Sequence, residues 1–371
     1  MKKLLGIVLT LLLLISLMAC AAKENVDTQV PDEQQVPAED ASVPAETEFL
    51  ILERPDDAIE SLEWAKEQTW DKKYTVGFAN LVEDSEDMLL MRDYMVECCE
   101  AYGMEVICVN NNFDGATALS NAEVLLQKGI DGLIEFNVDE SVGGVIMEKC
   151  NEAGVPVIAI DIPHPGATFF GADNEKCGFI AGEALANQAV EKWNGEVDCL
   201  LLIDHMDSGE LPRQRILKAP DGVRSVIPDF PEDRVFIVDG GGHDVTDCQS
   251  AVASFLAAHP DWDNILICGL QTTDGIGALA AIEMADRVDD CIMIINNEND
   301  FFAHVKNYPD EESSPWYGCV TFMIRYYGQW VAPAMREILD TGVMPETVYV
   351  DHDILTRDNI DEMFPTWKED Y

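Results

Sequence analysis

The sequence predicts an α/β fold made of two Rossmann-like lobes, each built on a parallel sheet. Short strand-like runs alternate with helix-length segments along most of the chain, which is typical of repeated βαβ units. Several runs are continuously apolar, for example Ile292–Ile295, and such runs suit strands that are buried on both faces of a parallel sheet. The length of 371 residues fits two domains, and the two halves repeat this alternation loosely.

Residues 1–20 have the features of an export signal. Lys2 and Lys3 precede the apolar stretch Leu4–Met18, which is shorter than the roughly 20 residues that span a bilayer. The end of the stretch, with Ala19 before Cys20, resembles the bacterial lipoprotein signal, in which the cysteine is lipidated and begins the mature chain. The alternative is an ordinary cleaved signal with an incidental cysteine. We expect a lipid-anchored protein at the extracytoplasmic face of the cell membrane.

The next two segments connect this signal to the globular body. Residues 21–54 are acidic and rich in proline over most of their length, so we expect a disordered tether. Residues 55–73 lead into the body, and Pro55–Gln68 has the pattern of a short amphipathic helix.

The body begins at Tyr74, and its elements follow from the apolar pattern. The expected strands are Tyr74–Ala79, Glu105–Val109, Gly132–Phe136, Val157–Ile160, Thr168–Phe170, Asp198–Ile203, Arg234–Val238, Asn264–Ile267, Ile292–Ile295, Gly318–Phe322 and Val348–Val350. The expected helices are Met88–Ala101, Ala116–Lys128, Val142–Ala153, Glu175–Trp193, Val245–Ala258, Gly275–Asp286 and Arg325–Thr341.

Charge and composition exclude several classes of protein. The chain has 70 acidic and 23 basic residues and a net charge of −47, which disfavours binding to nucleic acid. Its 11 cysteines show no CxxC spacing, so we expect buried thiols and not a redox or metal motif. The six histidines show no HExxH pattern, and we expect neither a metal nor a cofactor.

Six phrases of the body, in this order, resemble the type I periplasmic binding proteins of sugar ABC importers, the ribose- and galactose-binding group. They are Gln127-Lys128-Gly129-Ile130-Asp131-Gly132-Leu133-Ile134, Glu152-Ala153-Gly154-Val155-Pro156-Val157-Ile158-Ala159-Ile160-Asp161, Gly171-Ala172-Asp173-Asn174, Gly178-Phe179-Ile180-Ala181-Gly182-Glu183, Leu256-Ala257-Ala258-His259-Pro260-Asp261 and Gly277-Ala278-Leu279-Ala280-Ala281.

The resemblance implies two lobes joined by three chain crossings that close on a small polar ligand. By analogy, the N-lobe comprises residues 74–172 and 323–346, and the C-lobe comprises residues 173–322 and 347–371. In open parallel sheets, ligands bind beyond the carboxyl ends of the strands, which places the expected site between these ends.

Three residues match family positions that contact the ligand. Asp161 matches an aspartate that accepts sugar hydroxyls, and its alternative role is to cap the turn at Pro163. Arg215 matches an arginine that forks onto ligand oxygens, and its alternative role is that of a helix-surface arginine. Asn174 matches a polar position near the crossing into the second lobe, and it could instead cap the following helix.

Further candidates end strands or stand near family positions. Asn80 and Asn137 end two strands, Gln271 stands near a family asparagine and Asn297 at a family aspartate, and each could instead serve a cap or turn. His243 falls near an aromatic position of the family.

Other positions depart from the family pattern. Where aromatics usually open the first helix, this chain has an acidic stretch that includes Glu83 and Asp87. The acids have an ordinary explanation as helix N-terminal residues, and a cationic ligand bound by Asp87, Glu83 and Asp161 is the alternative. Trp316 and Tyr317 are candidates to replace the missing stacking rings.

The sequence therefore predicts a lipid-anchored substrate-binding protein that captures a sugar-like solute for an ABC permease, without chemistry and as a monomer. Two alternatives remain. One is a sensor that presents its ligand-bound state to a membrane receptor. The other is an exported sugar-processing enzyme on the same frame, which would need opposed carboxylates or a nucleophile–base pair.

Overall fold

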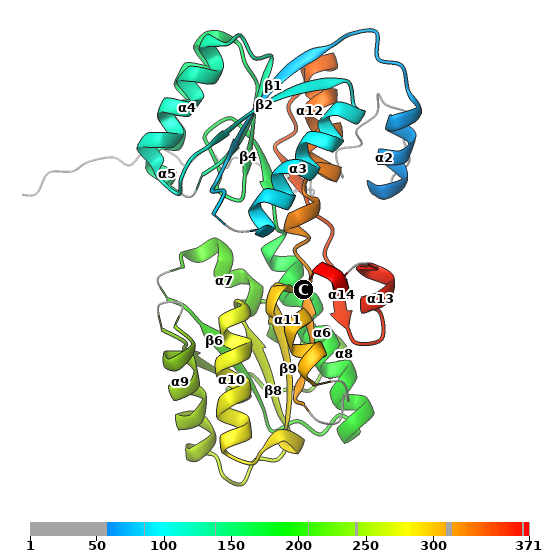
Figure 1. Cartoon of the computed structure of the whole chain (residues 1–371). Coiled ribbons are helices and arrows are strands. Elements are labelled where there is room, and N and C mark those ends of the chain that lie inside the picture. The colour runs from blue at the N-terminus through cyan, green and yellow to red at the C-terminus, as the bar shows by residue number, and fades with distance from the viewer. Residues whose placement is uncertain are drawn as a thin grey trace, which may run out of the picture. The chain divides into compact units, whose positions relative to one another are not determined.

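The computed structural model describes residues 58–84, 86–137, 139–206, 208–241, 244–308, 314–365 and 367–370. The export signal, Cys20 and the tether that we predict for residues 21–54 lie outside the described residues. Two six-stranded sheets organise the described part of the chain, as the sequence predicts (Figure 1). We call the parts built on the first and second sheet the N-lobe and the C-lobe.

The N-lobe sheet is entirely parallel. In spatial order its strands are β11 (Thr347–Tyr349), β5 (Thr168–Gly171), β4 (Val157–Ile160), β3 (Gly132–Phe136), β1 (Tyr74–Asn80) and β2 (Met104–Asn110). The C-lobe sheet is parallel except for β12, which runs antiparallel to β10. Its order is β12 (Ile354–Thr356), β10 (Trp316–Val320), β9 (Cys291–Asn296), β8 (Ile265–Gly269), β6 (Cys199–Asp204) and β7 (Val235–Asp239).

Helices cover both faces of each sheet (Figure 1). Those of the N-lobe are α2 (Ala58–Glu67), α3 (Glu86–Ala101), α4 (Gly115–Gln127), α5 (Glu140–Ala153) and α12 (Gly328–Thr341). Those of the C-lobe are α6 (Asn174–Trp193), α7 (Glu210–Leu217), α8 (Ala219–Val226), α9 (Val245–Ala258), α10 (Thr272–Met284), α11 (Asn299–Asn307), α13 (Ile360–Met363) and α14 (Trp367–Asp370). Short 3-10 turns are η1 (Glu232–Arg234), η2 (Val288–Asp290) and η4 (Ile324–Tyr326). None of these helices combines the length and apolar content that crossing a membrane requires.

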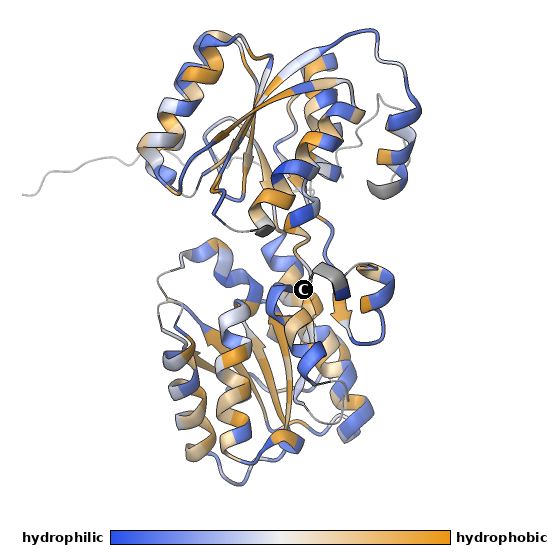
Figure 2. Cartoon of the chain, in the orientation of Figure 1, coloured by the Kyte–Doolittle hydropathy of each residue, from blue (hydrophilic) through white to orange (hydrophobic). Residues whose placement is uncertain are grey.

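Each sheet carries an apolar core on both faces, so four buried clusters hold the two lobes. In the N-lobe, α4 and α5 close one core and α2, α3 and α12 close the other. Figure 2 shows the apolar strands between helices whose outer faces are hydrophilic. Burial on both faces explains why the strands read as unbroken apolar runs in the sequence.

Local signals fix where the helices begin and end. The aspartates before α4, α5, α6 and α9 accept hydrogen bonds from backbone N–H groups of the first turn; these residues are Asp114, Asp139, Asp173 and Asp244. Gly154 ends α5 with a φ of 69°, a left-handed conformation that glycine adopts without steric cost. The helices therefore start just beyond the carboxyl ends of strands and leave these ends open.

The chain passes between the two sheets three times: from β5 to α6, from β10 to α12 and from β11 to β12. His352, on the third passage, links the other two. Its Nε2 accepts from the N–H of Asp173 at 3.0 Å, and its Nδ1 lies 2.7 Å from the carbonyl oxygen of Thr321. Burial lowers the pKa of His352, which favours the neutral ring that this pattern needs.

One expected lobe boundary is wrong. We assigned residues 347–371 to the C-lobe, but β11 pairs in parallel with β5 of the N-lobe sheet. Val350 belongs to the N-lobe core as well. The third crossing therefore follows Val350, because β5 offers a free edge that β11 completes.

Candidate functional site

Asp161 directly follows β4 and has a strained backbone. Its φ is 61°, in the left-handed region that non-glycine residues rarely adopt. A Cβ atom on Gly171 of the neighbouring strand would lie 2.8 Å from Asp161 Oδ1, so glycine leaves the room for this carboxylate. Its Oδ1 accepts a hydrogen bond from the Tyr327 hydroxyl at 3.3 Å. Strain of this kind at a strand end is typical of functional positions.

Arg215 lies on α7 of the C-lobe and is held by two contacts. Its Nε donates to Asn174 Oδ1 at 2.6 Å, and its guanidinium carbon lies 4.5 Å from the centre of the Phe322 ring. Among the described residues, no partner is found for the terminal nitrogens Nη1 and Nη2. Gly178 on α6 allows this arrangement, because a side chain there would collide with the backbone at Gln214.

Asp161 and Arg215 influence one another electrostatically. Burial raises the pKa of Asp161 to about 6, although the charge of Arg215 and the hydrogen bond from Tyr327 act in the opposite direction. Burial also lowers the pKa of Arg215, while the charge of Asp161 counteracts this effect. An acceptor of the N-lobe and donors of the C-lobe therefore lie within electrostatic range of one another, and both side chains are partly exposed.

The alternative roles of these three residues receive no support. Asp161 makes no hydrogen bond to the turn at Pro163, and Arg215 is stacked on an aromatic ring. The N-cap of α6 is Asp173, so Asn174 does not cap the helix. Its amide instead bridges Arg215 and the carbonyl of Ala172.

Asn80 and Asn137 end β1 and β3 as expected, but each is buried and serves its own loop. Asn80 donates to the carbonyls of Val82 and Met88 and accepts from the N–H of Leu81. Asn137 donates to the carbonyl of Asp139 and accepts from its N–H. Both side chains therefore hold their own turns, and their contact with a ligand stays a prediction.

Gln271 and Asn297 lie at the carboxyl ends of β8 and β9. Gln271 caps α10, and its amide donates to Thr273 Oγ1 and lies 3.3 Å from His205 Nε2. Asn297 has a φ of 82°, and its side chain accepts from the N–H of Asn299. Both are partly exposed, so a capping role and a ligand contact are compatible here.

A buried polar cluster stands behind Gln271. His205 Nε2 lies 2.7 Å from Asp274 Oδ1, and the other oxygen of Asp274 accepts from the N–H groups of Leu270 and Gln271. Asp204 forms an ion pair with Arg213, the first helical arginine of α7. These pairs fix the loops after β6 and β8, and thereby the position of α7.

One of the acids that the cationic-ligand alternative requires already has a basic partner. Glu83 pairs with Arg92, with 2.9 Å between Oε2 and Nη1. Asp87 lies in the first turn of α3, and the structure does not describe its side chain. His243 lies outside the described residues.

The expectation that Trp316 and Tyr317 replace the missing stacking rings is wrong. Both lie at the start of β10, whereas the candidate site lies at the carboxyl ends of the strands. Trp316 is 1% exposed, and its indole N–H donates to the carbonyl of Gly318. Two aromatic residues at the start of a strand give the same sequence pattern whether they face a ligand or the core. The sequence therefore could not distinguish a stacking role from core packing.

Tyr327 and the stacking of Arg215 on Phe322 escaped the sequence analysis. Tyr327 falls within the expected helix Arg325–Thr341, where an aromatic residue signals core packing. Its contact with Asp161 spans 166 positions of the chain, and no local pattern carries such information.

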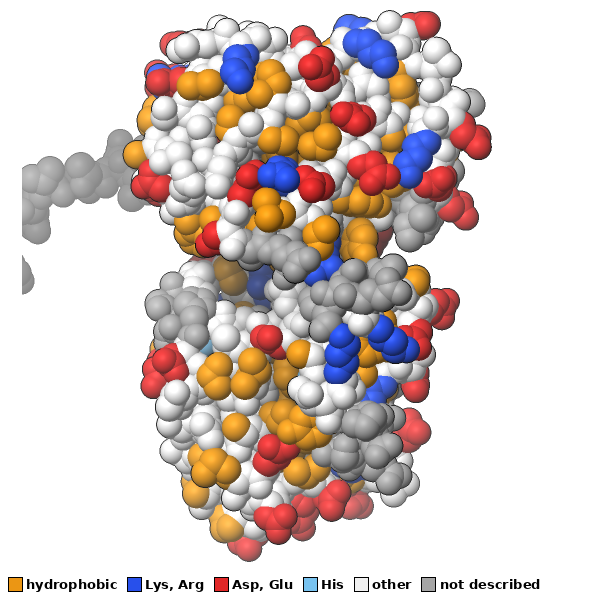
Figure 3. All heavy atoms as spheres, in the orientation of Figure 1, with side chains coloured by type: hydrophobic (Ala, Val, Ile, Leu, Met, Phe, Trp, Pro, Cys, Tyr) orange, Lys and Arg blue, Asp and Glu red, His pale blue; other side chains and the backbone are white. Residues whose placement is uncertain are grey.

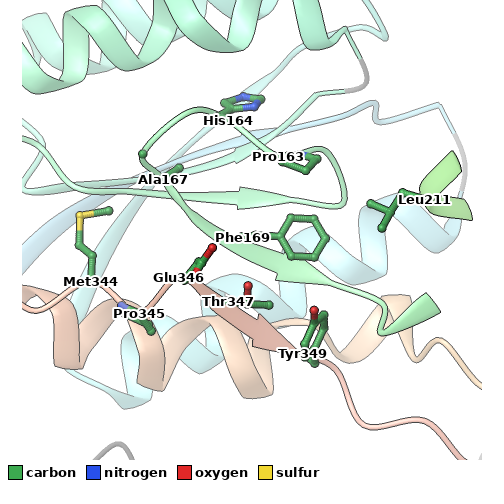
Figure 4. A pocket seen from close by; sticks show the side chains of 11 residues that line it. Pro163, His164, Ala167, Phe169, Leu211, Met344, Pro345, Glu346, Thr347 and Tyr349 are labelled. Atoms are coloured by element: carbon green, nitrogen blue, oxygen red, sulfur yellow. The ribbon is translucent and has the colours of Figure 1, made fainter. Parts of the chain in front are cut away.

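A cavity of about 500 Å³ lies along β5 and β11, next to the loop after β4 (Figure 4). Its wall includes Phe169 and Tyr349, whose rings meet edge to face, and Leu211 of α7. A second cavity of about 390 Å³ shares these three residues and reaches Asn174. Neither cavity is lined by Asp161 or Arg215. We therefore define the candidate site by the polar side chains at the strand ends and not by the volume of a cavity.

In the view of Figure 3, acidic side chains are spread over both lobes and outnumber the basic ones. Within the described ranges, no group of three or more His, Cys, Asp or Glu side chains could hold a metal ion.

The fold is that of two-lobed binding proteins, and comparison with known families agrees. Residues 76–342 match the model of the periplasmic binding protein domain. This span exceeds half of the chain, so the protein belongs to the periplasmic binding protein family, and the expected resemblance is confirmed.

Individual relatives are distant. The ribose import binding protein of Bacillus subtilis is 27% identical over 136 residues, which cover 35% of this chain and 45% of that protein. The L-arabinose-binding periplasmic protein of Escherichia coli is 22% identical over 263 residues, which cover 67% of this chain and 78% of the relative. The structure of AraP, an arabinose-binding protein from Geobacillus stearothermophilus, aligns with a TM-score of 0.62 at 15% identity, over 79% of this chain and 99% of that one.

Proposed function

We propose that this protein is the lipid-anchored, extracytoplasmic substrate-binding component of an ABC importer and that it captures a sugar or sugar-like solute. The observation that carries the proposal is that Asp161, at the end of β4, lies within electrostatic range of Arg215, whose guanidinium is held by Asn174 beside the first crossing. Lobe closure surrounds the ligand with these groups, and the closed form then docks on the membrane permease.

The chemistry of these groups suits a hydroxyl-rich ligand. The Asp161 carboxylate offers acceptor positions that Tyr327 does not use, and the Nη atoms of Arg215 offer donors. A vicinal diol presents both an O–H donor and an oxygen acceptor, so it satisfies the carboxylate and the guanidinium together. Relatives named for ribose and L-arabinose support the same ligand class.

The structure of the site also argues against a simple cationic ligand. The charges of an ionised Asp161 and of Arg215 sum to zero, and Glu83 is paired with Arg92. A charged amine would therefore leave Arg215 without a partner in a half-buried place, which is unfavourable.

The test is a thermal-shift screen of the purified protein over sugars, polyols, amino sugars and nucleosides. A ligand present at about 100 times its dissociation constant stabilises the folded state by about 2.7 kcal/mol. For a body of about 300 residues that corresponds to a rise in Tm of roughly 4 °C. We expect this shift with at least one sugar-like compound, together with a fall in the radius of gyration measured by X-ray scattering.

Asp161→Ala and Arg215→Ala are expected to abolish the shift while the ligand-free protein stays folded. Matched controls are Asp263→Ala and Lys218→Ala: Asp263 is exposed, and Lys218, also at the surface, follows α7. Both controls should retain the full shift. Retained binding in both site variants contradicts the assignment, and conversion of the sugar into a product contradicts a purely binding function.

A further inference from the structure

Tyr327 joins the hinge to the candidate ligand acceptor. It lies between η4 and α12, on the second crossing, where the chain returns from β10 to the N-lobe. The side chain is only 1% exposed, and its ring packs edge-on against Phe170 of β5, with 4.8 Å between the ring centres. Its hydroxyl donates to Asp161 Oδ1. Tyr327 thus contacts the carboxylate from the protein side, in a place that a ligand cannot reach.

Asp161 has little freedom once this contact is made. Its backbone is left-handed, and Gly171 lies against Cα and Oδ1 on the side of β5. Tyr327 supplies the one hydrogen bond that the described residues give to this carboxylate. Because Oδ1 is engaged there, Oδ2 keeps its acceptor positions for a ligand.

The groups that act on Asp161 come from two elements besides its own. From α7, Arg215 favours the ionised carboxylate; from the second crossing, the Tyr327 hydroxyl does the same. A further charge, that of Glu298, acts on Tyr327. The Cys177 thiol near Arg215 stays neutral, because burial raises its pKa well above the usual value. Burial opposes ionisation, so the charge of Asp161 near neutral pH depends on Arg215 and Tyr327 together.

We propose that Tyr327 is a positioning residue that holds Asp161 ionised and correctly oriented for the ligand, without touching the ligand itself. The inference rests on the proposed function, because it concerns how the same site binds. Tyr327 of the second crossing then strengthens Asp161 as a hydrogen-bond acceptor, although Asp161 itself follows β4.

The test compares the pH dependence of ligand affinity in the wild type and in Tyr327→Phe, which removes only the hydroxyl. Binding of the sugar identified in the thermal-shift screen is measured by calorimetry between pH 5 and 8.5. In the wild type, affinity falls as the pH drops through about 6, where Asp161 takes up a proton. Loss of the hydroxyl raises this midpoint, so the variant should bind about fivefold more weakly at pH 6 and less than twofold more weakly at pH 8.5.

Tyr326→Phe is the matched control. Tyr326 is the neighbouring residue, and its hydroxyl makes no contact with Asp161, so its pH profile should follow the wild type. A purely structural role of Tyr327 would weaken binding by the same factor at every pH. That outcome, or an unchanged profile in Tyr327→Phe, overturns the proposal.

A second measurement does not need a ligand. The carboxyl carbon of Asp161 is assigned by nuclear magnetic resonance through its loss in Asp161→Asn, and its titration is followed in the ligand-free protein. The titration midpoint should lie higher in Tyr327→Phe than in the wild type, and an equal midpoint contradicts the proposal. If no sugar binds the wild type, the proposed function fails, while this titration still decides the role of Tyr327.

Discussion

Glu135 is an ionisable side chain in the middle of the N-lobe sheet. It lies in β3 with no exposed surface, and its Oε1 accepts from Asn111 Nδ2 at 3.2 Å. Its Oε2 is buried without a hydrogen-bond partner among the described residues. Burial raises the pKa of Glu135 to about 8, although the bond from Asn111 counteracts this. The folded protein therefore keeps this carboxyl protonated at neutral pH.

Glu135→Gln should remove a pH-dependent loss of stability. Because the folded pKa lies above the unfolded one, stability is fully present below about pH 4.5 and is lost as the pH rises toward about 8. Between pH 5 and pH 8 the wild type should lose roughly 3 kcal/mol more unfolding free energy than the variant. Urea denaturation at both pH values measures this difference.

Glu105→Gln is the matched control, since Glu105 is an exposed glutamate on β2, the edge strand of the same sheet. It should leave the pH dependence of the wild type unchanged. If Glu135→Gln and Glu105→Gln gave parallel stability curves, Glu135 would have to be ionised in the folded protein.

Residues at the strand ends show how far sequence reasoning reaches at this scale. Family resemblance singled out Asp161 and Arg215, and the structure brings both to the hinge. It could not separate them from Asn80 and Asn137, which also follow strands but satisfy their own loops. The distinction depends on which polar atoms already have partners, and that is decided by loop geometry.

At the scale of elements, the contact between α6 and α8 depends on two glycines. A Cβ atom on Gly182 would collide with the backbone oxygen of Ala219, and one on Gly222 with that of Phe179. The axes of α6 and α8 therefore approach closely. The helix α6 also packs against α7, and Asn174 of α6 accepts a hydrogen bond from Arg215 of α7. Gly178 and Gly182 belong to a phrase noted in the sequence: Gly178 allows α6 to approach α7, and Gly182 allows it to approach α8.

Gly182→Ala should destabilise the protein, because the extra methyl group forces the two helix backbones apart. Overpacking of this kind costs about 1–3 kcal/mol or more. Gly144→Ala is the control: this position lies on the exposed face of α5 with open space around it, and alanine should stabilise the helix by up to about 1 kcal/mol. Thermal unfolding of both variants checks the opposite signs. A neutral Gly182→Ala contradicts the close helix contact.

All the expected strands and helices of the body occur in the structure, but β12 and the short helices α7, α8, α11, α13 and α14 were missed. Pro212 and Pro220 read as breaks in the sequence, yet each lies in the first turn of a short helix, where proline is tolerated. Helices of eight residues gain their stability from packing, so their own sequence carries a weak signal.

At the scale of the whole molecule, the cysteines of the described part form a largely buried set of thiols in both lobes. The ten described cysteines are free thiols, nine of them buried and Cys108 intermediate. Burial raises the pKa of the Cys108 thiol to about 11, and it also raises the pKa of the other thiols, for example that of Cys150. Stability therefore comes from the two lobe cores, as the unbroken apolar strands suggest.

Thiol titration of the full chain with Cys20→Ser tests this description. In the native state we expect little reaction with a maleimide at pH 7 and a first, slow modification at Cys108, because thiolates are rare and shielded. In guanidinium chloride all ten thiols should react, and a reductant should leave the Tm unchanged. Fast native labelling of several cysteines, or fewer than ten thiols after unfolding, contradicts the structure.

The sequence by itself determined the two-lobed α/β architecture, because strands buried on both faces must be apolar throughout and helix ends carry their own capping residues. It also determined the family, through six short phrases in order. The tertiary structure alone decided that β11 completes the N-lobe sheet, that Asn80 and Asn137 serve loops, and that Tyr327 reaches Asp161. The pairing of β11 with β5 and the contact of Tyr327 with Asp161 join groups far apart in the chain, and such pairs form only when the lobes and their crossings are in place. The roles of Asn80 and Asn137 depend on the exact geometry of their loops, which residue type alone does not specify.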